Sequence, residues 1–322
     1  STDRNLLSKI LNDLERSDKT DNQRLEDKAL DDFQSKFSTK AKFSSHSEHK
    51  QFLNFLHFII KKKLLNPINK ICSLSIFYCL RILLRDPEYQ LVFVQENGMI
   101  GLKTQMDLYL NIHSIDQCGD HNNNESTYTA CKVLVHMLNI LLKLIMHTPN
   151  HIEREYIISS EIIESITRLL NNTQDLIVLQ NILRLLINMI DQTELYVKEI
   201  IKLETIDSLL QILLYKDLEI KQLSLQLMAN FLGHPEGREC IPRIPNDFLD
   251  AFTSHLSHNN VKVLDHTIWC LTHCAENEDN RRRIRLTGAI PLLLSLLENG
   301  NRFFDFSLPS TNTNHEEYQS IS

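Results

Sequence analysis

The clearest pattern in the chain is an apolar helical stripe, a short polar turn and a second apolar helix. In residues 261–297, apolar side chains recur at the spacing of one face of an amphipathic helix: Val263, Leu264, Ile268 and Leu271. A short basic helix then starts at Asn280, and a Gly-Ala-Ile-Pro sequence at 288–291 leads into the next apolar helix. Further long amphipathic helices are predicted at about 130–147, 176–190 and 219–232.

The helices recur at a nearly constant spacing. One polar residue stands near the end of each long helix, and the steps between these residues are 45, 42 and 43: Lys143, Asn188, Asn230 and His273. A fifth match near Leu83 lies about 60 residues before Lys143, which exceeds a repeat period of about 40–47. The Asn-rich sequence at 116–127 explains the excess as an inserted polar loop.

The corners between helices repeat as well. Gly98-Met99-Ile100 matches Gly288-Ala289-Ile290, and a glycine suits a left-handed residue at a helix end. Pro291 suits the first turn of the following helix. Residues 65–297 therefore resemble the armadillo repeat family. The resemblance implies an all-α, armadillo-like, right-handed α-solenoid of about five repeats, in which stacked neighbours bury each other's apolar faces.

Three segments are expected along the chain. An N-terminal arm (1–44) precedes a repeat domain (45–299) with a polar insert at 114–128, and a flexible tail follows (300–322). Within the arm, an amphipathic helix is followed by a charged linker at 15–28. The helix either folds back on the first repeat, binds a partner or the groove of the array as a detachable segment, or stays disordered. A helix at 48–64 is expected to act as the N-terminal cap.

Composition narrows the functional classes. The 322 residues include only 7 Gly and 8 Pro, which favours long helices with short corners. A net charge of −7 gives no field that would attract nucleic acid, and the apolar run at 52–60 is too short to span a membrane, so no membrane span is expected. Seven scattered cysteines and the lack of a secretion signal indicate a cytoplasmic protein, with a nuclear or cytoskeleton-associated location as the alternative.

The resemblance also implies a binding surface. In armadillo proteins the third helix of each repeat lines a groove, and an asparagine there, with a tryptophan one turn earlier, holds an extended peptide. Asparagine suits this role because its amide both donates and accepts. The residues of this chain at these positions are the expected partner-binding residues: Lys143, Arg184, Asn188, Gln226, Asn230, Trp269 and His273. The complete Trp-Asn pair does not occur in any one repeat.

Metal binding, cofactor binding and catalysis have little support. His266, Cys270 and Cys274 follow one another at helical spacing, but the outer two lie ~12 Å apart and cannot share one ion. The basic cluster at 281–285 follows acidic residues that reduce its field. The sequence contains no GxSxG, Walker or GxGxxG motif, so we expect a protein that is not an enzyme.

Two functions therefore stay open. The first is a non-enzymatic scaffold or adaptor whose armadillo groove binds an extended or helical segment of a partner protein. The alternative is a structural module of a larger cytoskeletal, ciliary or transport assembly, or the regulatory end of a longer polypeptide.

Overall fold

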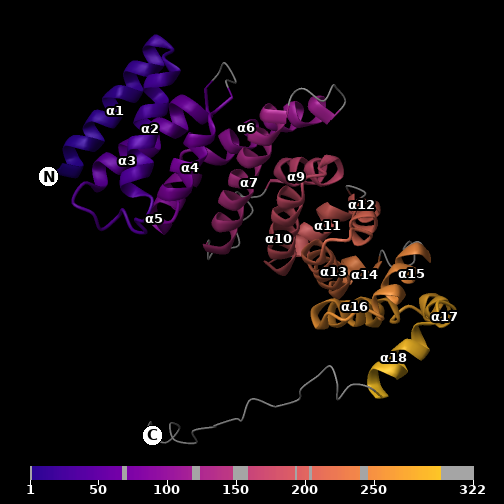
Figure 1. Cartoon of the computed structure of the whole chain (residues 1–322). Helices are drawn as coiled ribbons and strands as arrows, with labels where there is room; N and C mark the ends of the chain where they lie inside the picture. Colours follow the sequence, from indigo (N-terminus) through magenta and orange to yellow (C-terminus); the bar gives the residue numbers. More distant parts are fainter. Residues whose placement is uncertain are drawn as a thin grey trace, which may run out of the picture. The chain divides into compact units, whose positions relative to one another are not determined.

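Helices account for all the regular structure that is described. The computed structural model describes residues 2–66, 71–117, 124–147, 159–192, 194–202, 205–239 and 246–298 (Figure 1). Within these ranges no strand occurs, which confirms the all-α prediction. Residues 299–322, including the predicted tail, lie outside them.

The N-terminal part holds four helical segments. They are α1 (Thr2–Thr20), α2 (Gln23–Phe37), α3 (His49–Phe58) and η1 (Ile59–Leu64), a π-helical continuation of α3. The predicted cap helix at 48–64 corresponds to α3 and η1.

The remaining described helices fall into three sets that recur in the same order along the chain. We call the first set the long helices, because all of them but the 10-residue α4 have 14 or more residues: α4 (Leu74–Leu83), α7 (Asn124–His147), α10 (Leu176–Gln192), α13 (Leu218–Gly233) and α16 (Val261–Cys274). The second set comprises α5 (Pro87–Gln95), α11 (Glu194–Lys202), α14 (Pro235–Glu239) and α17 (Glu278–Leu286). The third set comprises α6 (Gly98–Gln117), α9 (Ser160–Asn172), α12 (Thr205–Leu213), α15 (Asn246–His255) and α18 (Ala289–Glu298).

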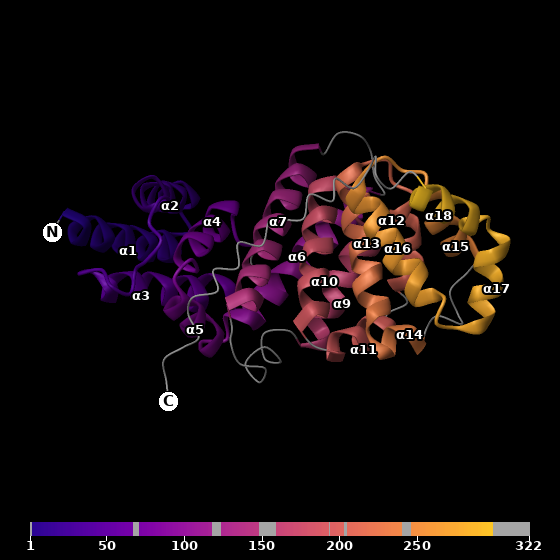
Figure 2. The ribbon, with the colours of Figure 1, turned by 90° about the horizontal axis from the view of Figure 1, so that it is seen from below.

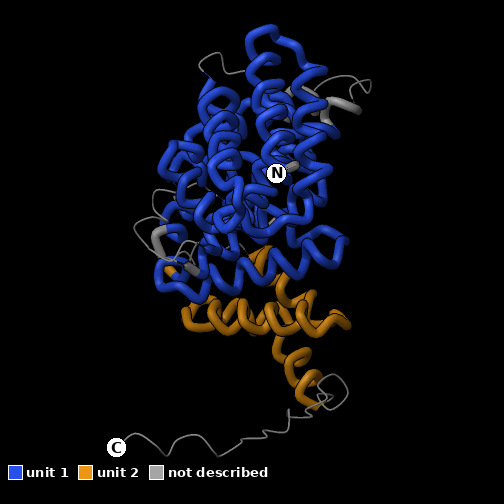
Figure 3. Tube along the Cα trace, turned by 90° about the vertical axis from the view of Figure 1, so that its left-hand side faces the viewer, with its two compact units in different colours: residues 1–238 blue, residues 239–322 orange. Residues whose placement is uncertain are grey.

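The helices form two compact units, one ending at Arg238 and the other beginning at Glu239 (Figure 3). In the first unit, α2, α4, α7, α10 and α13 each pack against the next, and Figure 2 shows α7, α10 and α13 side by side. We call α4, α7, α10 and α13 the long-helix row. A second row packs in the order η1, α6, α9 and α12. In the second unit, α15 packs against α16 and α17.

Burial follows the periodic apolar positions. In α10 the side chains that face its neighbours are at most 5% exposed: Val178, Leu179, Ile182, Leu183, Leu185, Leu186, Ile187, Met189 and Ile190. Burying a leucine or isoleucine of this kind contributes about 1.5–3 kcal/mol. Because one helix cannot cover so wide an apolar surface, α10 depends on α7 and α13 for its stability.

The two glycine corners differ in how they use the glycine. Gly288 has a φ of 81°, the predicted left-handed conformation, and Pro291 lies in the first turn of α18. At the other corner the left-handed residue is Asn97, with a φ of 62°. Gly98 is required there for space, because a Cβ would lie 2.5 Å from the Phe93 ring.

The polar insert is shorter than the sequence indicated. Residues 114–117 extend α6 and residues 124–128 begin α7, so that only 118–123 of the predicted segment lie outside the described residues. The long spacing before Lys143 thus arises partly from two long helices of 20 and 24 residues. Polar composition alone does not distinguish a loop from the polar ends of two helices.

The charged stretch at 15–28, predicted as a linker, is almost entirely helical. α1 continues to Thr20, Asp21 turns the chain with a φ of 48°, and α2 begins at Gln23. The stripe of α1 is buried at Leu7, Ile10 and Leu14, and α1 packs against α2 and α3. The charges of this stretch recur three or four residues apart, which is compatible with a helix whose polar face is solvated, and this explains the difference.

Helix α7 contains a long apolar segment that was not predicted from the sequence. By length and composition alone, the 20 residues from Tyr128 to His147 in α7 are apolar enough to cross a membrane. About 56% of this segment is buried, and α7 packs against α4, α6 and α10. The core helix of a soluble repeat protein passes the same test, so this observation is weak evidence for a membrane span.

Candidate partner-binding surface

The predicted binding residues lie where the repeat spacing placed them, near the ends of the long helices. Lys143 is on α7, Arg184 and Asn188 on α10, and Gln226 and Asn230 on α13, and all five are half-buried. Because α7, α10 and α13 are consecutive neighbours, these residues belong to one side-by-side set of helices in the first unit.

Both asparagines already make hydrogen bonds within the protein. The Asn188 amide donates to the carbonyl oxygen of Arg184 at 2.8 Å, and that of Asn230 donates to Asp191 Oδ1 at 2.6 Å. Burial raises the pKa of Asp191, while the bond from Asn230 lowers it in part. An asparagine amide has two donor hydrogens and an acceptor oxygen, so each side chain retains capacity for a partner.

Arg184 makes a link between repeats. Its guanidinium donates to Glu219 at the start of α13, and both side chains are more than a third exposed. Exposed pairs of this kind stabilise a protein by about 0–1 kcal/mol. Because Glu219 offsets the positive charge of Arg184, Arg184 should attract an acidic partner less strongly.

Trp269 and His273 belong to the second unit. The Trp269 side chain is 52% exposed, and its ring stacks on that of His273 with centroids 5.7 Å apart. His273 Nδ1 lies 3.4 Å from Glu276 Oε1. An exposed, supported indole is typical of a contact residue in protein interfaces.

A second column of polar residues at repeat spacing, not predicted from the sequence, lies along the long helices. Asn139, Asn181, Ser224 and Thr267 follow one another at steps of 42, 43 and 43 residues, and all but Asn139 are at most 8% exposed. Asn139 Nδ2 donates to Asn181 Oδ1 at 3.0 Å, which joins α7 to α10. The sequence contains these residues at the same repeat period as the predicted binding residues. Each stands four to seven residues before Lys143, Asn188, Asn230 or His273.

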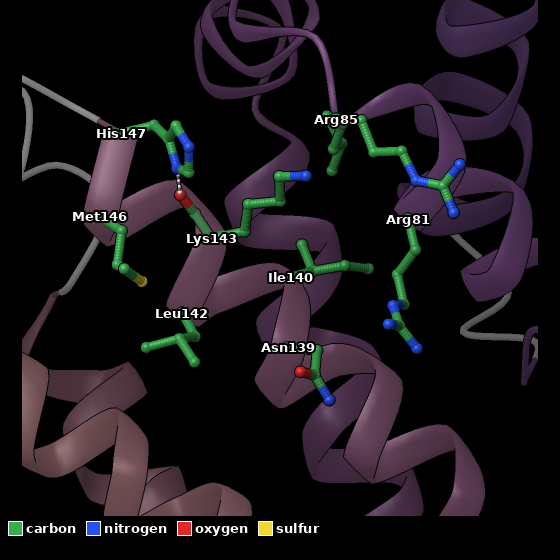
Figure 4. A pocket seen from close by; sticks show the side chains of 9 residues that line it. Arg81, Arg85, Asn139, Ile140, Leu142, Lys143, Met146 and His147 are labelled. Atoms are coloured by element: carbon green, nitrogen blue, oxygen red, sulfur yellow. Dashed lines mark hydrogen bonds between the residues drawn. The ribbon is translucent and has the colours of Figure 1, made fainter. Parts of the chain in front are cut away.

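A pocket of about 250 Å³ lies between α4 and α7 (Figure 4). Its polar lining is mostly basic: Arg81 and Arg85 come from the α4 side, and Lys143 and His147 come from α7, together with the neutral Asn139. Apolar contacts border it at Leu84, Ile140, Leu142 and Met146. We call it the cationic pocket. Among the predicted site residues only Lys143 lines it.

The two arginines of the cationic pocket were not among the residues predicted from the sequence. They stand one helical turn apart in LRILLRD, around the fifth match of the repeat. Aligning that segment with the turn around Lys143 would have brought basic residues from two adjacent repeats to the same place.

Charges in the cationic pocket act on one another. Burial lowers the pKa of Lys143, and the positive charges of Arg85 and Arg81 lower it further. Burial also lowers the pKa of Arg81, and Arg85 adds to that effect. Such shifts occur where cations of like sign are held close together and partly shielded from water.

The cysteines of the described residues behave as core side chains. Cys72, Cys79, Cys131, Cys270 and Cys274 are buried free thiols. Burial raises the pKa of Cys72 and Cys274 to about 12 and of Cys131 to about 11. The described part of the chain contains no cluster of three or more His, Cys, Asp or Glu side chains suited to a metal ion.

Solved structures establish the fold. A computationally designed armadillo repeat protein for modular peptide recognition aligns with 84% of this chain and 98% of its own length, with a TM-score of 0.58 and 13% identity. The chain has an armadillo repeat fold. A second designed armadillo repeat protein, solved in complex with the peptide (KR)4, aligns with 76% of this chain and 93% of its own length, with a TM-score of 0.55 and 14% identity.

The chain also has two distant relatives in sequence. The serine/threonine-protein kinase Nek10 of Mus musculus is 26% identical over 219 residues, and that of Homo sapiens is 27% identical over 215 residues. Each match includes 65% of this chain, which spans only 18% and 17% of the lengths of these relatives. No family model matches the chain.

Proposed function

We propose that the chain is a non-enzymatic scaffold or adaptor whose armadillo array binds a segment of a partner protein. The observation that carries the proposal is the row of half-buried polar side chains at repeat spacing on α7, α10 and α13. A designed protein of the same fold in complex with the peptide (KR)4 supports this use of the architecture. Binding spread over several repeats should weaken gradually as single contacts are removed.

The proposal is tested by replacing the predicted contacts together. A variant with alanine at Asn188, Asn230, Trp269 and His273 should lose most of the proteins that co-purify with the wild-type chain, measured by quantitative mass spectrometry. The control replaces four exposed residues that belong to neither polar column with alanine: Glu164, Arg168, Lys216 and Asp250. If both variants fold and retain the same partners, binding through this column is wrong.

A regulatory segment of a longer polypeptide is the second candidate. It is favoured by the match to Nek10, because the matched part is less than a fifth of that kinase. The glycine-rich loop and the H-R-D and D-F-G motifs of protein kinases do not occur in this sequence. The chain alone should therefore show no ATP-dependent phosphorylation of a general protein substrate. Its mass by size-exclusion chromatography with light scattering would show whether it forms a stable assembly.

We also propose a cytoplasmic location, based on the seven scattered cysteines and the moderate negative charge. Fluorescence microscopy of the tagged protein tests this, and enrichment in the nucleus or on the cytoskeleton would favour the alternatives.

A further inference from the structure

Among the described residues, Arg81, Arg85 and Lys143 of the cationic pocket form no ion pair, whereas Lys61 and Lys103 of the same unit do. Lys61 Nζ lies 2.9 Å from Glu96 Oε2, and Lys103 Nζ lies 3.1 Å from Asp107 Oδ2. Among the described residues no carboxylate oxygen lies within 4.0 Å of a side-chain nitrogen of Arg81, Arg85 or Lys143. Within the described part of this chain, whose net charge is −7, positive charge is thus gathered at one pocket without a carboxylate beside it.

The two arginines are held in place by neutral groups. Arg81 Nη1 lies 2.8 Å from His136 Nδ1, and the His136 ring packs edge-on against Tyr78 at 5.2 Å. Burial lowers the pKa of His136 to about 4, with further contributions from Arg81 and Lys132, so the ring is neutral and accepts the hydrogen bond. Arg85 donates to the carbonyl oxygens of Ser38 and Lys40. Side chains fixed in advance lose less entropy when a ligand binds.

The size of the pocket restricts its occupant. A volume of about 250 Å³ is below the ~300–1,000 Å³ of pockets that enclose small-molecule ligands. It accommodates one side-chain group of a longer ligand. Met146, 56% exposed at the border, offers an apolar contact for the rest of that ligand.

We propose that the cationic pocket binds a phosphorylated side chain of the partner segment, a phosphoserine or phosphothreonine that inserts between α4 and α7. This inference rests on the proposed function and specifies its partner. A phosphate monoester carries a charge of about −1.5 to −2 and three acceptor oxygens, which matches two arginines and a lysine better than one carboxylate does. Guanidinium groups bind phosphate through paired hydrogen bonds, with Lys143 as a third charge.

The experiment measures binding of the full chain to a library of short peptides with a fixed central phosphoserine, followed by fluorescence anisotropy of the best peptide. Its unphosphorylated and glutamate forms and inorganic phosphate serve as competitors. Removing two cations, in Arg81→Gln/Lys143→Gln, should weaken binding of the phosphopeptide at least ~10-fold. The matched control, Arg168→Gln/Lys62→Gln, removes the same charge from exposed positions outside the pocket and should leave binding within about twofold.

The single variant Lys143→Gln separates loss of binding from loss of folding. It should fold normally, because the Lys143 side chain makes no hydrogen bond with another described residue. It should weaken binding several-fold without a change in melting temperature. Equal affinity for the phosphorylated and unphosphorylated peptides would overturn the proposal. It would also be overturned if inorganic phosphate displaced the labelled phosphopeptide at the same concentration as the unlabelled phosphopeptide does. If the pocket variants bind normally while the four-alanine column variant loses its partners, the scaffold function stands and the phosphate site is wrong.

Discussion

Asp86 shows how a single side chain ties the N-terminal segment to the first repeat. It is 2% exposed, and its Oδ2 accepts hydrogen bonds from the backbone N–H groups of Phe43 at 2.7 Å and Ser44 at 2.8 Å. Its Oδ1 accepts from Glu88 N at 3.1 Å and so caps α5. One carboxylate thereby satisfies three donors in two segments that are about 40 residues apart.

Asp86→Asn should reduce the free energy of unfolding by about 1–3 kcal/mol, because the amide group turns a donor toward a backbone donor. Chemical denaturation measures the change. The matched control is Asp217→Asn at the start of α13, where one oxygen accepts from Ile220 N at 2.9 Å. Asparagine caps as well as aspartate there, so that variant should change stability by less than about 0.5 kcal/mol.

The effect of Asp86 should depend on pH. Burial alone would raise the pKa of its carboxyl, but the hydrogen bonds from Ser44, Phe43 and Glu88 lower it below the ordinary 3.8. The charged form is therefore stabilised by folding, and this stabilisation is present above pH 3.8 and lost as the pH falls through the lower folded value. The stability difference between wild type and Asp86→Asn should be constant near neutrality and shrink below about pH 4. A difference that grew with acid would contradict this.

The buried thiols give a further residue-scale prediction. Since the thiolate is the reactive form, the raised pKa values and burial should keep the five described cysteines unalkylated in native protein at about pH 8. Mass spectrometry after iodoacetamide treatment should show these sites modified only after unfolding in urea. Rapid labelling of Cys270 in the folded protein would indicate that α16 opens locally.

At the scale of elements, Lys63 joins three helical segments. Its Nζ lies 2.6 Å from Glu26 Oε2 on α2 and 3.3 Å from Asp18 Oδ1 on α1, and the Lys63 and Glu26 side chains are 13% and 10% exposed. This ion pair holds α1 and α2 against η1 at a place where the apolar stripe of α1 has ended.

Lys63→Met should leave two carboxylates unpaired and cost about 1–3 kcal/mol, between the values for exposed and fully buried pairs. Hydrogen exchange should increase first in α1 and α2. Lys62→Met, at an exposed neighbouring position, is the control. An unchanged exchange rate in α1 and α2 would mean that apolar contacts alone hold them.

The long helices could be predicted from the sequence, whereas their polar contacts could not. The apolar period fixed α10 and α13 to within about two residues, because burial on both sides imposes a strict pattern. The bond between Arg81 and His136 joins residues 55 positions apart, and no local pattern specifies that their side chains meet. The cationic pocket was missed for the same reason, although Lys143 itself was selected.

For the whole molecule, stability should be distributed along the array of the first unit. In α10, Leu186 is fully buried, and its replacement by alanine should cost about 2–5 kcal/mol. Because α10 packs against α7 and α13, hydrogen exchange should rise in these helices more than in α1. Leu30→Ala in α2 is the comparison and should affect α1 and α4 more than α13. Equal loss throughout the unit in both variants would show a single cooperative transition instead.

The second polar column, which begins with Asn139 and Asn181, limits where residues can be inserted into the chain. The bond between Asn139 and Asn181 requires both amides to face each other across α7 and α10. One residue inserted in α10 before Asn181 would turn that side chain by about 100° around the helix axis. The same insertion between Asn172 and Leu176 would leave it in place. This hydrogen bond therefore fixes the rotation of α10 relative to α7. Insertions and deletions should be tolerated in the connections between helices and not within the helices.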